Sequence, residues 1–405
     1  MPEYRSDKVF DSAERSSVWV VFWAFLRLGL TSFGGPVAHL AYFREEFVNR
    51  RRWLGDQAYA DTVALCQFLP GPASSQVGMA LGLYRAGYGG AFAAWVGFTL
   101  PSALLLILFA YGVQAYGDAL ARGALQGLKI AAVAVVAQAV WGMARQLCPD
   151  ALRVTFMALT AAVVLLVPVP WVQVGCLLLA GVAGVWWLPA GQVGGHEPLP
   201  RRVGRRAGAL WLALFFVGLL VLPMLALTLS SPAIQMVDAF YRAGALVFGG
   251  GHVVLPLLQA ELVPTGWVDN DVFLAGYGAA QAVPGPLFTF AAFLGASSLQ
   301  GPTGWAGGML ALMAIFLPSF LLVAGVLPFW EALRSHARAR SALAGVNAAV
   351  VGLLLAALYQ PVWTSAIVGV HDVILALLAW VALMFWRWPP WLVVLACAVV
   401  GGIGL

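Results

Sequence analysis

The chain carries two short sequences twice, and every copy lies inside a long apolar run. FLRLGLTSFGG at 25–35 returns as FYRAGALVFGG at 240–250, with six of eleven positions identical at an offset of 215. ALCQFLPGP at 64–72 returns as GAAQAVPGP at 278–286, with Gln, Pro, Gly and Pro shared at an offset of 214. Repeats built around intramembrane charge and helix-breaking residues are typical of secondary transporters, whose binding site forms where the repeats meet. We therefore expect two copies of one helical unit.

The apolar composition places this unit in a membrane. Of 405 residues, 62% are hydrophobic and 10% are charged, far from the roughly 25% charged residues of a soluble domain. Runs of about 20 apolar residues, long enough to cross a bilayer, recur from residue 18 onward. The net charge of +5 does not indicate nucleic-acid binding, because the basic residues lie in short loops at membrane edges. Residues 1–17 are of mixed charge and predict a cytoplasmic N-terminal segment without a cleaved signal peptide.

The first two apolar runs are predicted to be re-entrant or broken helical hairpins. The run at 18–43 has basic residues on both flanks and is interrupted by Phe33-Gly34-Gly35-Pro36. The run at 58–83 has Pro70-Gly71-Pro72 at its centre. Glycine and proline end helices at such positions. Four full spans are then expected, at 88–113, 123–147, 151–168 and 170–189.

Loop charges predict that the second repeat is inverted in the membrane. The loop at 44–52 holds four arginines, whereas its counterpart at 259–271 holds acidic residues and no Lys or Arg. Basic loops mark the cytoplasmic side. An all-α polytopic fold is therefore expected, with about nine full spans plus four hairpins. Its parts are a first repeat at 18–189, a basic cytoplasmic loop and linking span at 190–230, and an inverted second repeat at 231–405.

Two arginines at matched positions, Arg27 and Arg242, are the first candidates for substrate contact. An arginine at mid-bilayer depth costs about 2.5–3.5 kcal/mol on insertion scales, so its presence there requires a function or a partner. The guanidinium carries a permanent charge and a planar fork of donors that suits oxyanions. The alternatives are that these side chains reach the membrane surface, brace a helix end, or pair with a carboxylate such as Glu46 or Glu261.

The helix breaks are predicted to present backbone N–H groups to an anion. Each break interrupts a helix, either at glycines or at a Pro-Gly-Pro turn. The second half-helix then begins with backbone N–H groups that have no partner in the helix, at its positive N-terminal end. A simple kink or tight helix packing would also explain them. These candidate substrate-binding residues are Gly34, Gly35, Gly249, Gly250, Pro70, Gly71, Pro284 and Gly285.

Polar side chains near the turns extend this candidate site. Gln67 and Gln281 precede their turns by three residues and can offer an amide to substrate or to freed carbonyl groups. Ser75 and Thr289 follow the turns, where hydroxyl groups cap helices or coordinate ligands. Lys129 lies within a span, where it adds a charge to the anion path or extends to the membrane surface.

Titratable residues near the breaks are candidates for coupling transport to protons. His39 and His252 lie just beyond the glycine breaks, where imidazole can relay protons or play a structural role. Asp61 is present in the first repeat only, and is either a coupling carboxylate or an interfacial one. Glu46 and Glu261 complete the set. The sequence has no nucleotide-binding or metal-ligand motif, so neither ATP hydrolysis, nor a metal, nor another cofactor is expected, and the chain is not expected to be an enzyme.

These motifs resemble those of the chromate ion transporter family in its long, two-domain form. The resemblance covers nearly the whole chain and is most specific in FLRLG…FGGP, in the QFLPGP turn and in their second-half equivalents FGGGH and VPGP. It implies an inner-membrane protein of bacteria or archaea that confers chromate resistance by exporting the dianion, driven by the proton-motive force. It also implies an antiparallel arrangement of the two domains. Pro36 is replaced by Gly251 in the second half, which is a departure from equivalence between the two glycine turns.

The function expected from the sequence is therefore export of chromate, a tetrahedral oxyanion for which sulfate is the structural mimic. A sulfate-type uptake carrier and a passive anion channel remain as alternatives. A membrane enzyme or lipid-binding scaffold would need an interfacial carboxylate or histidine cluster, which the sequence does not show. The expected partners are the oxyanion and the lipid bilayer, with a homodimer left open.

Overall fold

The computed structural model describes residues 17–116, 121–167, 169–189, 203–248 and 251–404, and within them the chain is all-α without strands. The predicted N-terminal segment and the first part of the 190–230 linker lie outside this range. In the first half the helices are α1 (Val18–Thr31), α2 (Gly35–Arg44), η2 (Glu45–Arg50), α3 (Asp56–Phe68), α4 (Ala73–Tyr116), α5 (Ala121–Leu147), α6 (Ala151–Leu166) and α7 (Pro170–Trp187). After the linking helix α8 (Arg205–Leu229), the second half contains α9 (Pro232–Leu246), η3 (Gly251–Val253), α10 (Val254–Leu262), α11 (Asn270–Ala282), η4 (Leu287–Thr289), α12 (Phe290–Ala296), α13 (Gly304–Val326), η5 (Leu327–Phe329), α14 (Trp330–Ser335), α15 (Ala337–Ala357), η6 (Leu358–Trp363), α16 (Thr364–Ala366), α17 (Val370–Met384) and α18 (Pro390–Gly404).

The long helices have the length and composition of membrane spans. Among the described residues, five are long and apolar enough to cross a bilayer, at Ala73–Ala115, Gly123–Leu147, Arg205–Leu229, Gly304–Phe329 and Ala337–Ala366. The linking helix α8 is the most exposed of these, with Leu227 84% exposed and Leu220 67% exposed. Such a continuous apolar surface on a helix is stable in lipid and not in water. The chain is therefore a multi-pass membrane protein.

The helices end at the predicted breaks. In the first repeat α1 stops at Thr31 and α2 starts at Gly35, after Gly34 in the left-handed region with φ of 100°. The Pro-Gly-Pro turn separates α3 from α4. In the second half α9 stops at Leu246 and η3 starts at Gly251, while the second Pro-Gly-Pro turn separates α11 from η4. Gly249 and Gly250 lie outside the described residues.

Small residues allow the closest helix contacts. Gly29 of α1 lies so near α4 that a methyl group there would meet the carbonyl oxygens of Gly97 and Phe98. In the second repeat the equivalent glycine, Gly244 of α9, lies equally close to the backbone of Ile315 in α13. Small residues let helix backbones approach in membranes, where packing rather than water exclusion holds helices together. The glycine two positions after each repeated arginine is therefore a packing residue.

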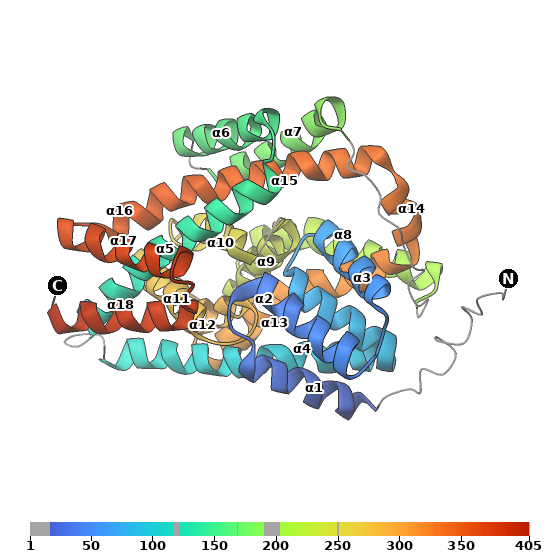
Figure 1. The fold of residues 1–405 in the computed structure, drawn as a ribbon, viewed down its shortest axis with the longest axis horizontal. Coiled ribbons are helices and arrows are strands. Elements are labelled where there is room, and N and C mark those ends of the chain that lie inside the picture. The colour runs from blue at the N-terminus through green and yellow to red at the C-terminus, as the bar shows by residue number, and fades with distance from the viewer. Residues whose placement is uncertain (1–16, 117–120, 168, 190–202, 249–250, 405) are drawn as a thin grey trace.

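Helices of the two repeats interleave around the middle of the molecule. Figure 1 shows α15 running along the upper side of the view with α6 and α7, while α1 and α4 run along the lower edge. The first-repeat helix α5 packs against α11, α17 and α18 of the second repeat. The second-repeat helix α15 packs in turn against α6 and α7. Residues at the middle therefore come from both repeats.

Candidate functional site

The four helix breaks contact one another across the two repeats. The Gly71 N–H donates to the Val247 carbonyl oxygen at 2.7 Å, and the Gly285 N–H donates to the Ser32 carbonyl oxygen at 2.9 Å. Gly71 and Gly285 are repeat equivalents, and so are Ser32 and Val247. Each Pro-Gly-Pro turn thus binds the other repeat's glycine break. Reciprocal pairing of this kind is what a two-fold relation between two units produces.

A second reciprocal contact surrounds each turn. A methyl group on Gly71 would meet the Ser319 hydroxyl of the second repeat, and one on Gly285 would meet the Ser102 hydroxyl of the first. Both turn glycines have positive φ, 119° for Gly71 and 104° for Gly285. A residue with a side chain is disfavoured there both by its backbone conformation and by lack of space. The glycine in each turn is required by the local geometry.

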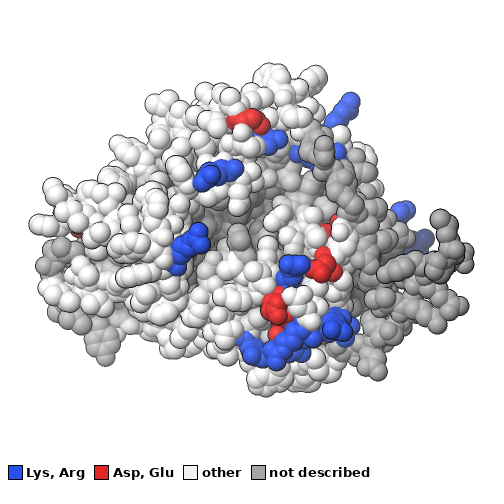
Figure 2. Space-filling model, viewed as in Figure 1, with Lys and Arg blue, Asp and Glu red and all other residues white. Residues whose placement is uncertain are grey.

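A cavity of about 1040 Å³ lies beside these contacts. Figure 2 shows a hollow in the middle of the visible face with basic side chains near its rim. Both repeats line the cavity. The lining includes the predicted residues Gly34, Gly35, Gln67, Gly71 and His252, together with Gly251 of the second break, and α4 begins at its wall with Ala73. Gln138, Gln146 and Asn347 add amide groups to the wall.

The charged residues of the cavity wall are all arginines. Arg153, Arg340 and Arg387 line it, and no Asp or Glu is among its described lining residues. Arg153 lies in the first turn of α6 with its Nε 3.4 Å from Asp150. Arg340 lies in the first turn of α15, and Arg387 lies in the loop between α17 and α18. The sequence reasoning missed these three because none belongs to a repeated motif, although each stands at the edge of an apolar run.

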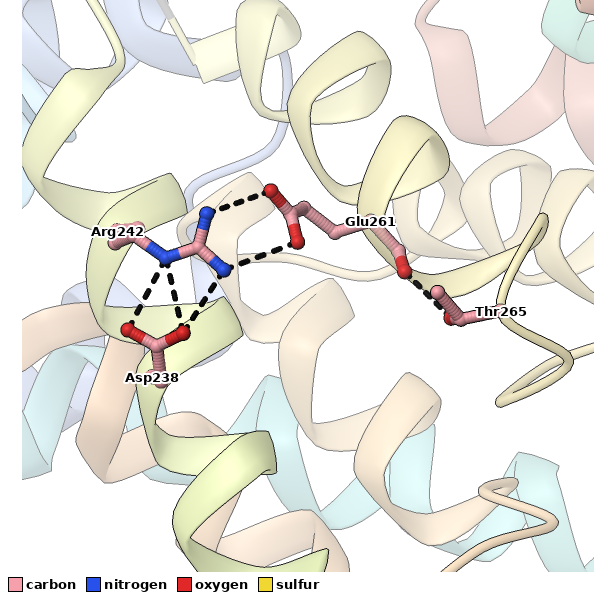
Figure 3. Close-up of polar contacts among 4 residues, drawn as sticks. All are labelled: Asp238, Arg242, Glu261 and Thr265. Carbon is pink, nitrogen blue, oxygen red and sulfur yellow. Dashed lines mark hydrogen bonds and ion pairs between the residues drawn. The ribbon is translucent and has the colours of Figure 1, made fainter. Parts of the chain in front are cut away.

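The structure places the two repeated arginines in different surroundings. Arg27 is exposed on α1, and among the described residues its guanidinium has no ion-pair partner. Arg242 is bound between Asp238 of the same helix and Glu261 of α10, as Figure 3 shows. Its Nη1 lies 2.7 Å from Glu261, and its Nε lies 3.0 Å from Asp238. Neither arginine is among the described residues of the cavity wall.

Four predicted polar residues lie away from the described cavity wall. Lys129 is buried and its Nζ donates to Asp271 at 3.0 Å, which joins α5 to the start of α11. Thr289 donates to the Pro286 carbonyl oxygen at 2.7 Å within its own turn. Ser75 is buried, and its hydroxyl has no partner among the described residues. The Gln281 amide nitrogen is likewise buried without a partner in the described part. The described cavity wall includes none of these four residues, and it also lacks Pro70, Pro284 and Gly285.

The proposed coupling residues are distributed over several places. His39 is buried in α2 with its Nδ1 3.4 Å from the Ser74 hydroxyl, whereas His252 lines the cavity with its Nδ1 2.7 Å from the Tyr277 hydroxyl. Asp61 is buried in α3. Glu46 in η2 accepts hydrogen bonds from Arg51 at 2.6 Å and Arg50 at 3.2 Å. Burial raises the pKa of Glu46, but the hydrogen bonds and charges of the two arginines outweigh this and hold the pKa below its usual value.

The fold and the cavity together define a class of protein. It is an all-α, multi-pass membrane protein built from a duplicated unit, with a positively charged cavity where the two copies meet. Within the described residues no group of three His, Cys, Asp or Glu side chains could hold a metal ion. A duplicated helical unit with a cavity between its two copies is typical of membrane transporters.

The chain belongs to the chromate transporter family, which it matches over residues 19–185 and 234–402. It is 29% identical over 376 residues to a chromate transport protein of Pseudomonas aeruginosa, covering 87% of this chain and 84% of that protein. It is 26% identical to a chromate transport protein of Cupriavidus metallidurans, covering 82% and 80% of the two chains. An uncharacterised transporter of Bacillus subtilis is 31% identical over 169 residues, which is 40% of this chain and 83% of that protein. No solved structure matches this chain.

Proposed function

We propose that this protein exports chromate across the inner membrane, driven by the proton-motive force, with its N-terminus in the cytoplasm. Its family membership and the chromate transport proteins among its relatives support chromate as the substrate. Chromate is a tetrahedral dianion, so its carrier must supply positive charge and hydrogen-bond donors and must exclude carboxylates from the path.

The observation that carries the proposal is the charge of the cavity. Three arginines and no described carboxylate line a space that both repeats enclose. Apolar walls around one sign of charge focus the field and raise the local concentration of the opposite ion. The N-terminal ends of α2 and α4 also lie at the wall, and each helix end can stabilise an anion by up to about 2 kcal/mol. We place the anion contacts on Arg340 and Arg387, because neither Arg27 nor Arg242 lines the cavity in this conformation.

Alternating access would follow from rocking of one repeat against the other. The opposite loop charges at 44–52 and 259–271 support an inverted arrangement of the repeats. The reciprocal hydrogen bonds of Gly71 and Gly285 support a two-fold axis between them. Each repeat makes the same turn-to-break contact with the other. These equivalent contacts would let the two repeats exchange conformations around a fixed central site.

The proposal is tested by transport of labelled chromate into everted membrane vesicles. Arg340→Gln and Arg387→Gln should each lower kcat/KM about 10- to 100-fold, since a hydrogen bond to a charged group is worth about 1.5–3 kcal/mol. Arg338→Gln is the matched control, because Arg338 lies on the same turn of α15 but is absent from the described cavity wall. Transport by both cavity variants at the rate of the control would contradict the proposal.

The same vesicles separate the alternatives. An exporter driven by protons accumulates chromate only when a proton gradient is imposed, whereas a passive channel only equilibrates it. A sulfate-type uptake carrier would move the anion in the opposite direction.

A further inference from the structure

A cluster of three charges, separate from the cavity, lies between α9 and α10. Arg242 is held by Asp238 and Glu261, with the three side chains 19%, 7% and 22% exposed. The guanidinium also lies over the Trp171 ring, with Cζ 5.9 Å from the ring centre. Figure 3 shows the two carboxylates on either side of the arginine fork. The cluster thus joins three helices: α7, α9 and α10.

The charges of this cluster do not balance. One guanidinium faces two carboxylates, so the cluster carries one net negative charge when both acids are ionised. An uncompensated charge in a poorly solvated place is unfavourable, and binding one proton removes it. We propose that Asp238, Arg242 and Glu261 form the proton-binding site that couples anion transport to the proton-motive force, with Glu261 as the proton acceptor. This inference rests on the proposed function.

An unsatisfied acceptor beside the cluster fits a protonated carboxyl group. Gln173 of α7 is 7% exposed, and its Oε1 is buried without a partner among the described residues. It lines a small pocket together with Arg242 and Glu261. An ionised carboxylate can only accept hydrogen bonds, whereas a protonated one has an O–H to donate. A protonated Glu261 would bring a donor to the pocket that the unpartnered Gln173 lines.

The first repeat shows that the fold does not need this cluster. At the equivalent positions Trp23 replaces Asp238, Arg27 is exposed, and Glu46 is bound by Arg50 and Arg51 instead. The equivalent pair of helices, α1 and α2, still forms. A structural role common to both repeats would have placed the same ion pairs in both. The cluster is therefore specific to the second repeat, as expected for a functional site.

The surrounding elements bring few other charges. Of the helices packed against α9, α13 has no charged residue, and α8 carries Arg205 and Arg206 in its first turn only. Of those packed against α10, η3 carries His252, which is hydrogen-bonded to Tyr277, and α11 carries Asp271, which is paired with Lys129. Two further helices pack against α10: α7, whose titratable residue is Cys176, and α15, which has Arg338 and Arg340 in its first turn. Among the described residues, the charges that contact one another at this place are thus those of the three cluster members.

The test compares two forms of transport in liposomes that contain the purified full-length chain and labelled chromate. Counterflow, the exchange of internal for external chromate without a pH gradient, needs no net proton movement. Accumulation driven by an imposed pH gradient does. Glu261→Gln and Asp238→Asn should keep counterflow and lose pH-driven accumulation at least tenfold. Glu261→Asp should keep both, because it retains a titratable group.

Glu45→Gln is the control, since it makes the same change at an exposed glutamate of the first repeat that is not a coupling candidate. It should keep both activities. Accumulation driven by the pH gradient in Glu261→Gln and Asp238→Asn equal to that of Glu45→Gln would overturn the proton site. Absence of chromate counterflow in the wild-type protein would instead overturn the proposed function.

Infrared difference spectra between acid and neutral pH give a readout independent of transport. The C=O stretch of a protonated carboxyl should be present in wild-type protein and in Glu45→Gln, and reduced in Glu261→Gln. An unchanged band in Glu261→Gln would also refute the assignment, even if transport by that variant were lost through misfolding.

Discussion

Replacing the glycine of a Pro-Gly-Pro turn tests whether these turns hold the two repeats together. Gly71 has φ of 119°, and its N–H donates to Val247 of the other repeat. A residue with a side chain in such a conformation costs about 1–3 kcal/mol. The new methyl group of Gly71→Ala would also meet the Ser319 hydroxyl, and overpacking of this kind costs about 1–3 kcal/mol more. We therefore expect Gly71→Ala to destabilise the protein by about 2–6 kcal/mol.

Gly112 in α4 supplies the control, because a methyl group there would meet nothing within 4 Å. Gly112→Ala should stabilise its helix by about 0.5–1 kcal/mol, so the two variants should differ by at least about 2.5 kcal/mol. Tryptophan fluorescence of the purified protein during heating gives the midpoint of thermal unfolding of each variant, and these midpoints rank the variants by stability. The midpoint should be lowest for Gly71→Ala and equally low for its counterpart Gly285→Ala. A midpoint for Gly71→Ala equal to that of Gly112→Ala would refute the reasoning.

Two further predictions concern the membrane edge. The pKa of folded Glu46 is held below the usual 4.5, so its contribution to stability is complete above that pH and declines as the pH falls through the folded value. Glu46→Gln should therefore be less stable than wild type at neutral pH, and thermal unfolding should show the difference shrinking below about pH 4.5; a pH-independent difference would contradict this account. Single cysteines at Asn49 and Thr265, in a chain without its native cysteines, should label from opposite sides of the membrane with an impermeant maleimide; labelling from the same side would exclude the inverted arrangement.

The helix breaks were predictable because their signal is local. Glycine and proline act on the backbone of their own neighbourhood, so Gly34, Gly35 and the two Pro-Gly-Pro turns ended helices where the sequence indicated. Repetition strengthened that signal, because a kink that occurs once is common in membrane helices and a matched set is not. The all-α membrane fold follows from composition in the same way.

The partners of charged side chains were not predictable, because they depend on which helices become neighbours. Arg27 and Arg242 have the same sequence context, but only Arg242 has an aspartate one turn before it, at the position of Trp23. Pairing of the repeated arginines with Glu261 was one of the alternatives that the sequence left open, but nothing in the sequence indicated which arginine would have the partner. The arginines of the cavity wall could not be predicted as one site from the sequence. Arg153, Arg340 and Arg387 come from three separate segments that only the tertiary fold brings together.

The two repeats are thus similar in backbone contacts and different in charge. The hydrogen bonds of Gly71 and Gly285 are equivalent, so the proposed rocking about them would give two end states with similar backbone packing. The ion pairs are not equivalent: Arg242 is bound to two carboxylates while Arg27 is exposed, and Glu46 is bound to two arginines at the membrane edge. If the repeats exchange conformations, the surroundings of these ion pairs differ between the two end states. Protonation of a cluster present in only one repeat would then shift the balance between the two states, because a ligand shifts an equilibrium only by its differential affinity for them.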